Sequence, residues 1–295
     1  MKILFCILQV IAIIILAPGL SGLIRKIKNN LRMRKGSPVL QSYFNFFKLL
    51  KKDEVVSNHA SWIFGFTPLV VLGSAVTASF LVPFFAPTLG INFMGDLIAL
   101  VFILALGRFF LALSSLDTAS AFGGMGASRE MFISSFAEPV ALLAIFTVSL
   151  NSGSTSLTTI AGAANAFKLS TLIAAIALFI VLIAETSRIP VDNQETHLEL
   201  TMVHEAMVLE YSGRSLALLE LAASIKQIIF FTLLVNLFCP FGGIITYPIK
   251  ILVLACVIAV TEVTLAKMRL FRVVDLLVFS VALGLFAVIA WAIGV

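Results

Sequence analysis

The sequence contains few charged residues. Asp, Glu, Lys and Arg make up 12% of its 295 residues, whereas 60% are hydrophobic and the mean hydropathy is +1.11. A soluble domain normally carries about 25% charged residues, so a chain this apolar cannot hide its hydrophobic surface from water. The composition therefore predicts an integral membrane protein and leaves little chain for a soluble domain. A net charge of +5 gives no reason to expect a nucleic-acid partner.

Cysteine and histidine are also scarce. Cys6, Cys239 and Cys256 stand alone in apolar stretches, without the close spacing of a metal-ligand or redox motif. We therefore expect no disulfide framework, no metal site and no iron–sulfur cluster in this chain. Three histidines are too few for haem ligation inside a membrane unless a loop folds in. If the protein takes part in electron transfer, the redox centres belong to its partners.

Apolar windows predict an all-α membrane protein with eight transmembrane helices in a single domain, 1–295. A spanning helix needs about 20 apolar residues. The windows lie at about 3–23, 61–83, 93–113, 132–150, 167–187, 216–239, 248–268 and 272–294. The first window is similar to a secretory signal, but the dense basic stretch that follows it opposes translocation and favours a retained helix.

The basic residues predict the orientation. Fifteen of the 20 Lys and Arg fall in the loops 24–59, 114–131 and 186–215 or in the turn after the seventh window, and three fall on the other side. Loops rich in Lys and Arg stay in the cytoplasm, so both termini are expected outside. In the first loop, Tyr43, Phe47 and Leu50 form an apolar stripe beside Lys48 and two further lysines, which is typical of a helix lying on anionic lipid.

The loop 186–215 is unusually acidic for a cytoplasmic loop. With Glu185 at its edge, it holds Asp192, Glu195, Glu199, Glu205 and Glu210. Asp192 and Glu195 have the spacing of a capping box, and apolar residues recur beyond them at helical intervals. The acidity favours a proton funnel or a docking face for a partner over a merely solvated amphipathic helix. His197 and His204 share a helix face, but without a third ligand a proton relay or simple hydrogen bonding is favoured over a metal.

Ionisable residues inside the apolar windows form the second candidate site. They are Arg108, Glu138, Glu185, Glu220, Lys226, Glu262 and, near a helix end, Asp275. An unpaired charge in the bilayer is costly, so each must face the bundle, pair with another charge or line a wet path. We expect Glu138, Glu185, Glu220, Lys226 and Glu262 to belong to a proton path, with structural ion pairs as the alternative. Glu220 and Lys226 lie on different helix faces and are expected to pair with other helices.

The acidic loop resembles a known signature. The string Glu185-Thr-Ser-Arg188-Ile-Pro190-Val-Asp192, followed by Glu195, Glu199 and Glu210-Tyr-Ser-Gly213, resembles the heel subunit of respiratory complex I, which helps to form the quinone chamber. The sequence is more similar still to the homologous subunit of nickel–iron hydrogenases of the formate hydrogenlyase and hydrogenase-4 type. His197 stands where the complex I signature has another Glu, and the stretches 123–130 and 135–139 also resemble the hydrogenase branch.

The resemblance implies a subunit without a redox cofactor of its own. It implies that the loop residues, including Arg188, Asp192, His204 and Glu205, seat a hydrophilic arm, and that buried carboxylates link this arm to ion pumping. The implied partners are the hydrogenase large and small subunits, an iron–sulfur subunit, antiporter-like membrane subunits and membrane lipid. The nickel–iron centre and the iron–sulfur clusters would lie on those partners, and the location would be a bacterial or archaeal cytoplasmic membrane.

Two other functions remain open from the sequence. One is a quinone-binding complex I subunit, although the basic turn after the first window lacks the longer Gly-Pro-Asn-Arg type of stretch found there. The other is a stand-alone ion or solute transporter, which the lack of an internal repeat or of paired half-helices disfavours. A bare membrane anchor does not explain the number of ionisable residues in the apolar windows.

Overall fold

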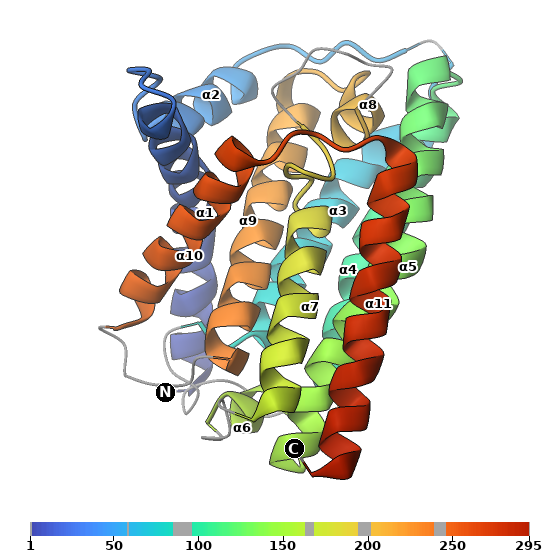
Figure 1. Ribbon diagram of the computed structural model, residues 1–295. Helices are drawn as coiled ribbons and strands as arrows, with labels where there is room; N and C mark the ends of the chain where they lie inside the picture. Colours follow the sequence, from blue (N-terminus) through green and yellow to red (C-terminus); the bar gives the residue numbers. More distant parts are fainter. Residues whose placement is uncertain are drawn as a thin grey trace.

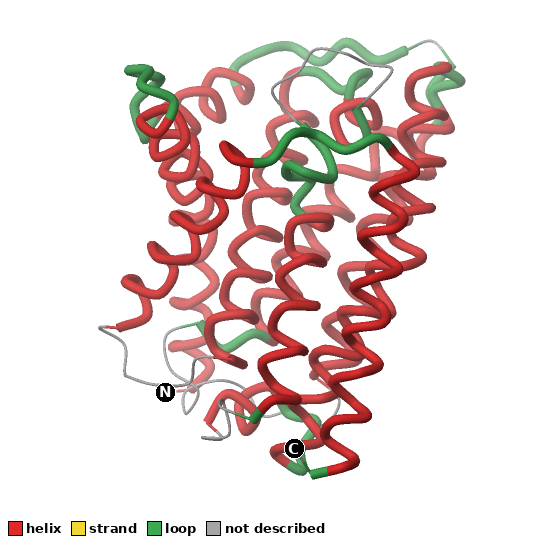
Figure 2. The backbone as a smooth tube through the Cα atoms, in the orientation of Figure 1, coloured by secondary structure: helices red, strands yellow, loops and turns green. Residues whose placement is uncertain are grey.

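The computed structural model describes residues 2–57, 59–84, 96–162, 168–193, 202–238 and 246–294. Within these ranges all regular structure is helical, as Figure 2 shows. The helices are α1 (Lys2–Leu31), α2 (Gln41–Leu50), α3 (Trp62–Leu81), α4 (Asp96–Asp117), α5 (Ala121–Ser152), α6 (Leu157–Gly162), α7 (Leu169–Glu185), α8 (His204–Val208), α9 (Gly213–Phe238), α10 (Thr246–Thr264) and α11 (Leu270–Ile293).

The all-helical membrane class predicted from composition is confirmed. Among the described residues, seven helices are long and apolar enough to cross a bilayer, namely α1, α3, α4, α5, α9, α10 and α11. The remaining expected span, 167–187, corresponds to α7, which is apolar but only 17 residues long. This is shorter than the roughly 20 residues that a perpendicular crossing needs. The count of eight is therefore not confirmed.

The short helices α2 and α8 lie at the same end of the bundle, and the two chain ends lie at the other (Figure 1). In Figure 1, α1 begins and α11 ends at the lower end, where α6 also lies, whereas α2 and α8 lie at the upper end. This arrangement agrees with the sequence grouping of the loops 24–59 and 186–215 on one side. Which side of the membrane that end faces remains a prediction.

Two expected loop regions are helical. α1 continues to Leu31, which places Arg25 and Lys28 on a helix, and α5 begins at Ala121, inside the loop expected at 114–131. A glycine of this helix allows close packing: a Cβ at Gly126 would lie 3.0 Å from the backbone oxygen of Val203. The start of α5 is capped by the hydroxyl of Ser120, which accepts a hydrogen bond from the N–H of Gly123.

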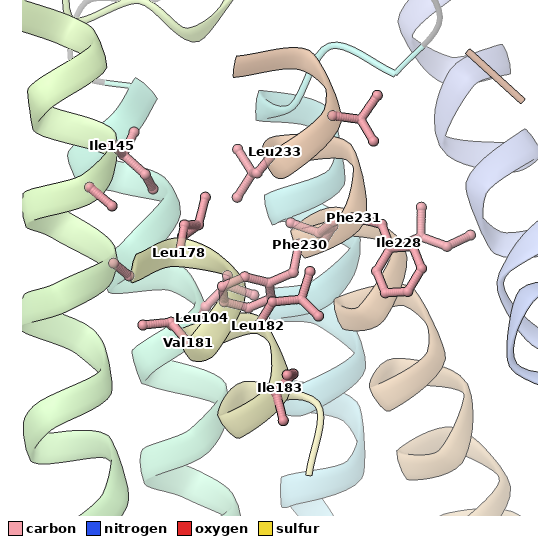
Figure 3. Close-up of a cluster of buried hydrophobic side chains, with 14 of the residues drawn as sticks. Leu104, Ile145, Leu178, Val181, Leu182, Ile183, Ile228, Phe230, Phe231 and Leu233 are labelled. Carbon is pink, nitrogen blue, oxygen red and sulfur yellow. The ribbon is translucent and has the colours of Figure 1, made fainter. Parts of the chain in front are cut away.

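The apolar core lies between α4, α5, α7 and α9. Figure 3 shows Leu104 of α4, Ile145 of α5, Leu182 of α7 and Phe231 of α9 among the side chains that meet there. Leu182 and Phe231 are fully buried. In a membrane protein the lipid-facing surface is as apolar as the core, so this close packing, more than hydrophobicity, holds the helices together.

The helix expected in the first loop is present as α2, and its position at the membrane surface stays a prediction. Tyr43 donates a hydrogen bond from its hydroxyl to the backbone oxygen of Ile15 at 2.6 Å. A Cβ at Gly22 would lie 2.1 Å from the backbone oxygen of Val39, so only glycine permits this approach to α1. Phe44 and Phe47 remain exposed, as does Lys48, which suits a helix at the membrane surface.

Candidate functional site

Arg108 of α4 is the centre of the first charged group. Its Nη2 lies 2.7 Å and 2.6 Å from the two carboxylate oxygens of Glu185, and its Nη1 lies 2.6 Å from Oε1 of Glu138. Its Nε is 3.7 Å from Oε1 of Glu130, and Lys226 Nζ is 2.7 Å from Glu185 Oε2. We call these five residues the Arg108 cluster. It places three acids against two bases.

Helix geometry explains how this cluster forms. Glu130 and Glu138 are eight residues apart in α5, which puts both on one face. Glu185 is the last residue of α7, and Lys226 lies in the middle of α9. Arg108 and Glu185 are buried, whereas the side chain of Glu138 is 34% exposed. A guanidinium that serves several carboxylates in a dry setting makes strong, directional hydrogen bonds.

Glu262 of α10 holds a second charged group. Its Oε2 lies 2.8 Å from Lys28 Nζ, and its Oε1 lies 2.6 Å from Arg188 Nη1. Arg188 Nη2 also donates to Gln227 Oε1 at 3.1 Å, and the hydroxyl of Ser21 donates to the same oxygen at 2.9 Å. We call these five residues the Glu262 cluster. It places two bases against one acid.

The two clusters face one cavity of about 300 Å³, which both of them line. His204, Glu205 and Glu220 line it as well. The buried charges are therefore not sealed in separate dry salt links, because they share a space with room for water and with loop residues. Charged side chains inside a membrane bundle commonly face such a shared polar space or pair with one another, and both occur here.

Asp192 fastens the loop that carries Arg188. It is 1% exposed, and its carboxylate accepts hydrogen bonds from Lys267 Nζ at 2.7 Å and from the backbone N–H groups of Asn193, Val203 and His204. The N–H of Met268 donates to the backbone oxygen of Pro190 at 2.9 Å. One carboxylate thus ties the end of the α7 loop to α8 and to the connection between α10 and α11. The helix that the sequence predicted directly after Asp192 lies largely outside the described residues, whereas the N–H of His204, at the start of α8, donates to the Asp192 carboxylate.

A family model described as NADH dehydrogenase matches residues 3–293. The chain belongs to this family. It is 31% identical over 99% of its length to hydrogenase-4 component C of Escherichia coli strain K12, covering 96% of that protein. It is 32% identical over 89% of its length to formate hydrogenlyase subunit 4 of the same strain, covering 86% of it.

Two further comparisons, one of sequence and one of structure, give related results. A subunit of the NADH-quinone oxidoreductase of Cupriavidus pinatubonensis strain JMP 134 is 29% identical over 72% of this chain and 64% of that protein. A solved structure of the membrane-bound sulfane sulfur reductase, an archaeal respiratory membrane complex, contains a chain with the same fold. The TM-score is 0.86 at 20% identity, with 98% of each chain covered. The relatives are subunits of membrane-bound oxidoreductase complexes, as the resemblance implied, and this chain is a multi-pass membrane protein.

The structure brings together most of the path residues expected from the sequence. Glu138, Glu185 and Lys226 lie in the Arg108 cluster, and Glu262 lies in the other. Lys226 pairs with another helix and not with Glu220, as expected. Glu220 itself is exposed at the cavity, where the charge of Arg25 acts on it, so it does not belong to either buried cluster.

Four residues of the two clusters were missed by the sequence reasoning, and one of them, Ser21, is an uncharged residue near the end of the first apolar window. Lys28 and Glu130 were assigned to loops because the apolar windows ended before them, and Gln227 carries no charge. Helical register was the available signal: Glu130 is two turns from Glu138, and Lys28 is two turns from Ser21. Arg108 was recognised as a charge inside a span but was not assigned to the path.

The acidic loop is described only in part. Glu195, His197 and Glu199 lie outside the described residues. His204 is half-buried, and burial lowers its pKa below the usual value, with Glu205 and Asp192 offsetting part of that effect. Glu210 precedes Tyr211, whose hydroxyl donates to the backbone oxygen of Phe64 and whose pKa burial raises to about 12.

A metal site is not visible in the described part of the chain. No group of three or more His, Cys, Asp or Glu side chains there could hold a metal ion. Independently of any metal, carboxylates held among cations can bind and release protons.

Proposed function

We propose that this chain is the non-redox membrane subunit of an energy-converting hydrogenase of the formate hydrogenlyase type. It seats a hydrophilic arm that carries the nickel–iron centre and the iron–sulfur clusters, and it couples electron transfer in that arm to movement of protons or sodium ions across the membrane. The complex lies in a bacterial or archaeal cytoplasmic membrane, with the loops of α2 and α8 in the cytoplasm. Similarity to hydrogenase-4 component C and to formate hydrogenlyase subunit 4 supports this assignment.

The observation that carries the coupling role is the continuous set of charges from Glu138 to Glu262. Glu185 shares Arg108 with Glu138, and the adjacent residues Lys226 and Gln227 reach one cluster each. A change of charge at the loop end of the cavity, near His204 and Glu205, alters the energy of each protonation state along this set. Electron transfer in an arm docked on that end can therefore bias where protons reside.

The acidic loop supports the docking role. We propose that Asp192 and Arg188 organise the loop, and that Glu195, His197, Glu199, His204, Glu205 and Glu210 form the face that the arm contacts. The predicted partners are the hydrogenase large and small subunits and the iron–sulfur subunit on this face, and antiporter-like subunits within the membrane.

Inverted membrane vesicles that contain the whole complex test the coupling role. Glu138→Gln and Glu185→Gln should lower the number of ions moved per hydrogen molecule formed, with Asp275→Asn as the matched control. Asp275 is an exposed carboxylate of α11, away from the residues that line the cavity. Unchanged ion movement per hydrogen in both glutamine variants would remove the path assignment.

Charge reversal tests the docking role. Glu195→Lys combined with Glu199→Lys should release the hydrophilic arm, seen as a smaller assembly on a native gel. Lys48→Glu, a reversal on the exposed face of α2, serves as the control. An assembly of unaltered size and activity in the double variant would rule the docking face out.

A quinone-binding role is the second candidate. The similarity to a subunit of an NADH-quinone oxidoreductase and the polar cavity both favour it. Quinone that co-purifies with the complex, or hydrogenase activity that responds to quinone-site inhibitors, would support this function over the first.

A further inference from the structure

The signature string of the acidic loop ends in Tyr211, Ser212 and Gly213, and none of these residues lines the cavity. In the structure they form the turn between α8 and α9. All three contact the chain that leads from α2 into α3. We call residues 53–57 of that chain the latch segment. The string therefore has a role apart from the buried ion pairs.

Tyr211 holds the start of α3. Its ring stacks on that of Phe64, with 4.0 Å between the ring centroids and 5° between the ring planes. Its hydroxyl also donates to the backbone oxygen of Phe64 at 3.1 Å. Both side chains are buried. An aromatic contact and a hydrogen bond to the same residue fix the turn before α9 against α3.

Ser212 and Gly213 hold the latch segment. The N–H of Val55 donates to Ser212 Oγ at 2.8 Å, and the Ser212 hydroxyl lies 3.0 Å from the backbone oxygen of Val55, to which it donates. One hydroxyl thus pairs with both backbone groups of Val55. At Gly213 the φ angle is +52°, and an added Cβ would lie 2.6 Å from the backbone oxygen of Asp53. Only glycine permits that approach.

Glu54 binds the latch segment to α9 from the other side. Its Oε1 accepts a hydrogen bond from the N–H of Ser215 at 2.6 Å and another from the Ser215 hydroxyl. Ser215 lies in the first turn of α9, where N–H groups have no partner within the helix and a negative charge is favoured by the helix dipole. A carboxylate from a distant part of the chain therefore caps α9.

α9 can carry a displacement from the latch segment to the charge clusters. It contains no proline, and no glycine after Gly213, so it lacks the usual causes of a kink and behaves as a rigid rod. At 1.5 Å per residue, Lys226 lies about 16 Å along the axis from Ser215. Lys226 and Gln227 bind one cluster each, so movement of the rod reaches both clusters.

The latch segment is open to contact from outside. Val55 and Val56 are 73% and 52% exposed, so the hydrogen bonds to Ser212 and Ser215 hold the segment and burial of its own side chains does not. The connection from α2 to α3 crosses the end of the bundle where α2 and α8 lie (Figure 1). A partner bound at that end can therefore bear on it.

We propose that the latch segment and α9 move as one unit, with Glu54 and Ser212 as the positioning residues that join them. A partner that bears on the latch segment then displaces Lys226 and Gln227 against their clusters. That the partner is the hydrophilic arm, and that the displacement serves coupling, rests on the proposed function. The attachment of the latch segment to α9 does not depend on it.

Hydrogen exchange of the whole complex tests the attachment. Glu54→Ala should quicken exchange in 213–217 about tenfold, and Ser212→Ala should do the same in 53–57, because each removes the partner of an N–H group there. Ser212→Thr keeps the hydroxyl and should exchange like the wild type. Lys51→Gln, a change to an exposed side chain before the latch segment, is the control. Wild-type exchange in both alanine variants would overturn the proposal.

Inverted membrane vesicles that contain the same variants test the transmission. With Glu54→Ala or Ser212→Ala, the complex should assemble and form hydrogen at the wild-type rate, but it should move fewer ions per hydrogen molecule. Ser212→Thr should restore the wild-type ratio, and Lys51→Gln should not alter it. A loss of assembly in the alanine variants would show a structural role only and overturn the transmission.

The control for the proposed function is Glu185→Gln in the same vesicles. If that variant lowers the ratio of ions to hydrogen while Glu54→Ala and Ser212→Ala leave it unchanged despite faster exchange, α9 does not transmit the displacement and the proposal is overturned. If Glu138→Gln and Glu185→Gln both leave the ratio unaltered, the coupling role itself fails. The exchange measurement then decides by itself whether the latch segment is attached to α9.

Discussion

Lys226 and Gln227 are neighbours in α9, yet they bind different charge clusters. Lys226 Nζ lies 2.7 Å from Glu185 Oε2, and Gln227 Oε1 lies 3.1 Å from Arg188 Nη2. Their two partners flank the turn that ends α7, where the N–H of Arg188 donates to the backbone oxygen of Ile183. One turn and one pair of adjacent side chains therefore connect the two clusters. A small shift of α9 against α7 changes both clusters together, which gives the proposed coupling a structural basis.

Removing the charge of Glu185 should destabilise the complex more than removing that of Glu138. Glu185→Gln leaves Arg108 and Lys226 without their shared carboxylate, and loss of one partner in a buried pair costs about 3–5 kcal/mol. Glu138 is partly exposed, so solvent screens its loss and the cost is smaller. Thermal unfolding of the detergent-solubilised complex measures the difference. Equal melting temperatures for the two variants would contradict this ranking.

A methyl group at Gly22 should displace α2. The added Cβ would lie 2.1 Å from the backbone oxygen of Val39, and backbone cannot move aside as a flexible side chain can. Gly22→Ala should lower stability by about 1–3 kcal/mol and increase proteolysis within 32–57. Gly73→Ala is the control, because a Cβ there meets nothing within 4 Å and should stabilise α3 by up to about 1 kcal/mol. Identical behaviour of the two variants would show that α2 does not pack as described.

Asp192→Asn should loosen both segments that the carboxylate holds. The substitution removes the charge that binds Lys267 and weakens the bonds from the N–H groups of Val203 and His204. Hydrogen exchange should quicken in 202–208 and 265–269 and stay unchanged at the start of α5. Exchange that is unaltered in the first two segments would mean that Asp192 does not fasten them.

His204 should make the stability of the complex depend on pH just below neutrality. Burial lowers its pKa in the folded chain, whereas in the unfolded chain the pKa is about 6.5. The unfolded state therefore binds more protons, and stability is complete above about pH 6.5 and falls as the pH drops below that value. Melting temperatures of the wild type between about pH 7.5 and 5.5 should decline, and His204→Gln should flatten this decline. If the melting temperature of the variant declines as steeply with falling pH as that of the wild type, groups other than His204 cause the decline.

Much of the site could be anticipated from single residues, but its connections could not. The motif around Glu185, Arg188 and Asp192 is visible as a string, and Glu262 stands out as an acid in an apolar window. Lys28 and Glu130 did not stand out, because hydropathy cannot tell where a helix continues beyond the apolar stretch. Gln227 carries no charge and becomes notable only because Ser21 and Arg188 converge on it.

The sequence by itself determined the class of the molecule, since an apolar excess of this size can be buried only in a bilayer, and it determined which charges had to be explained there. Only the tertiary structure decided which charge meets which. Arg108, Glu138, Glu185 and Lys226 come from four different helices. The physical reason is that an ion pair depends on distances of a few ångströms between side chains, and those distances follow from how the helices pack and not from spacing along the chain.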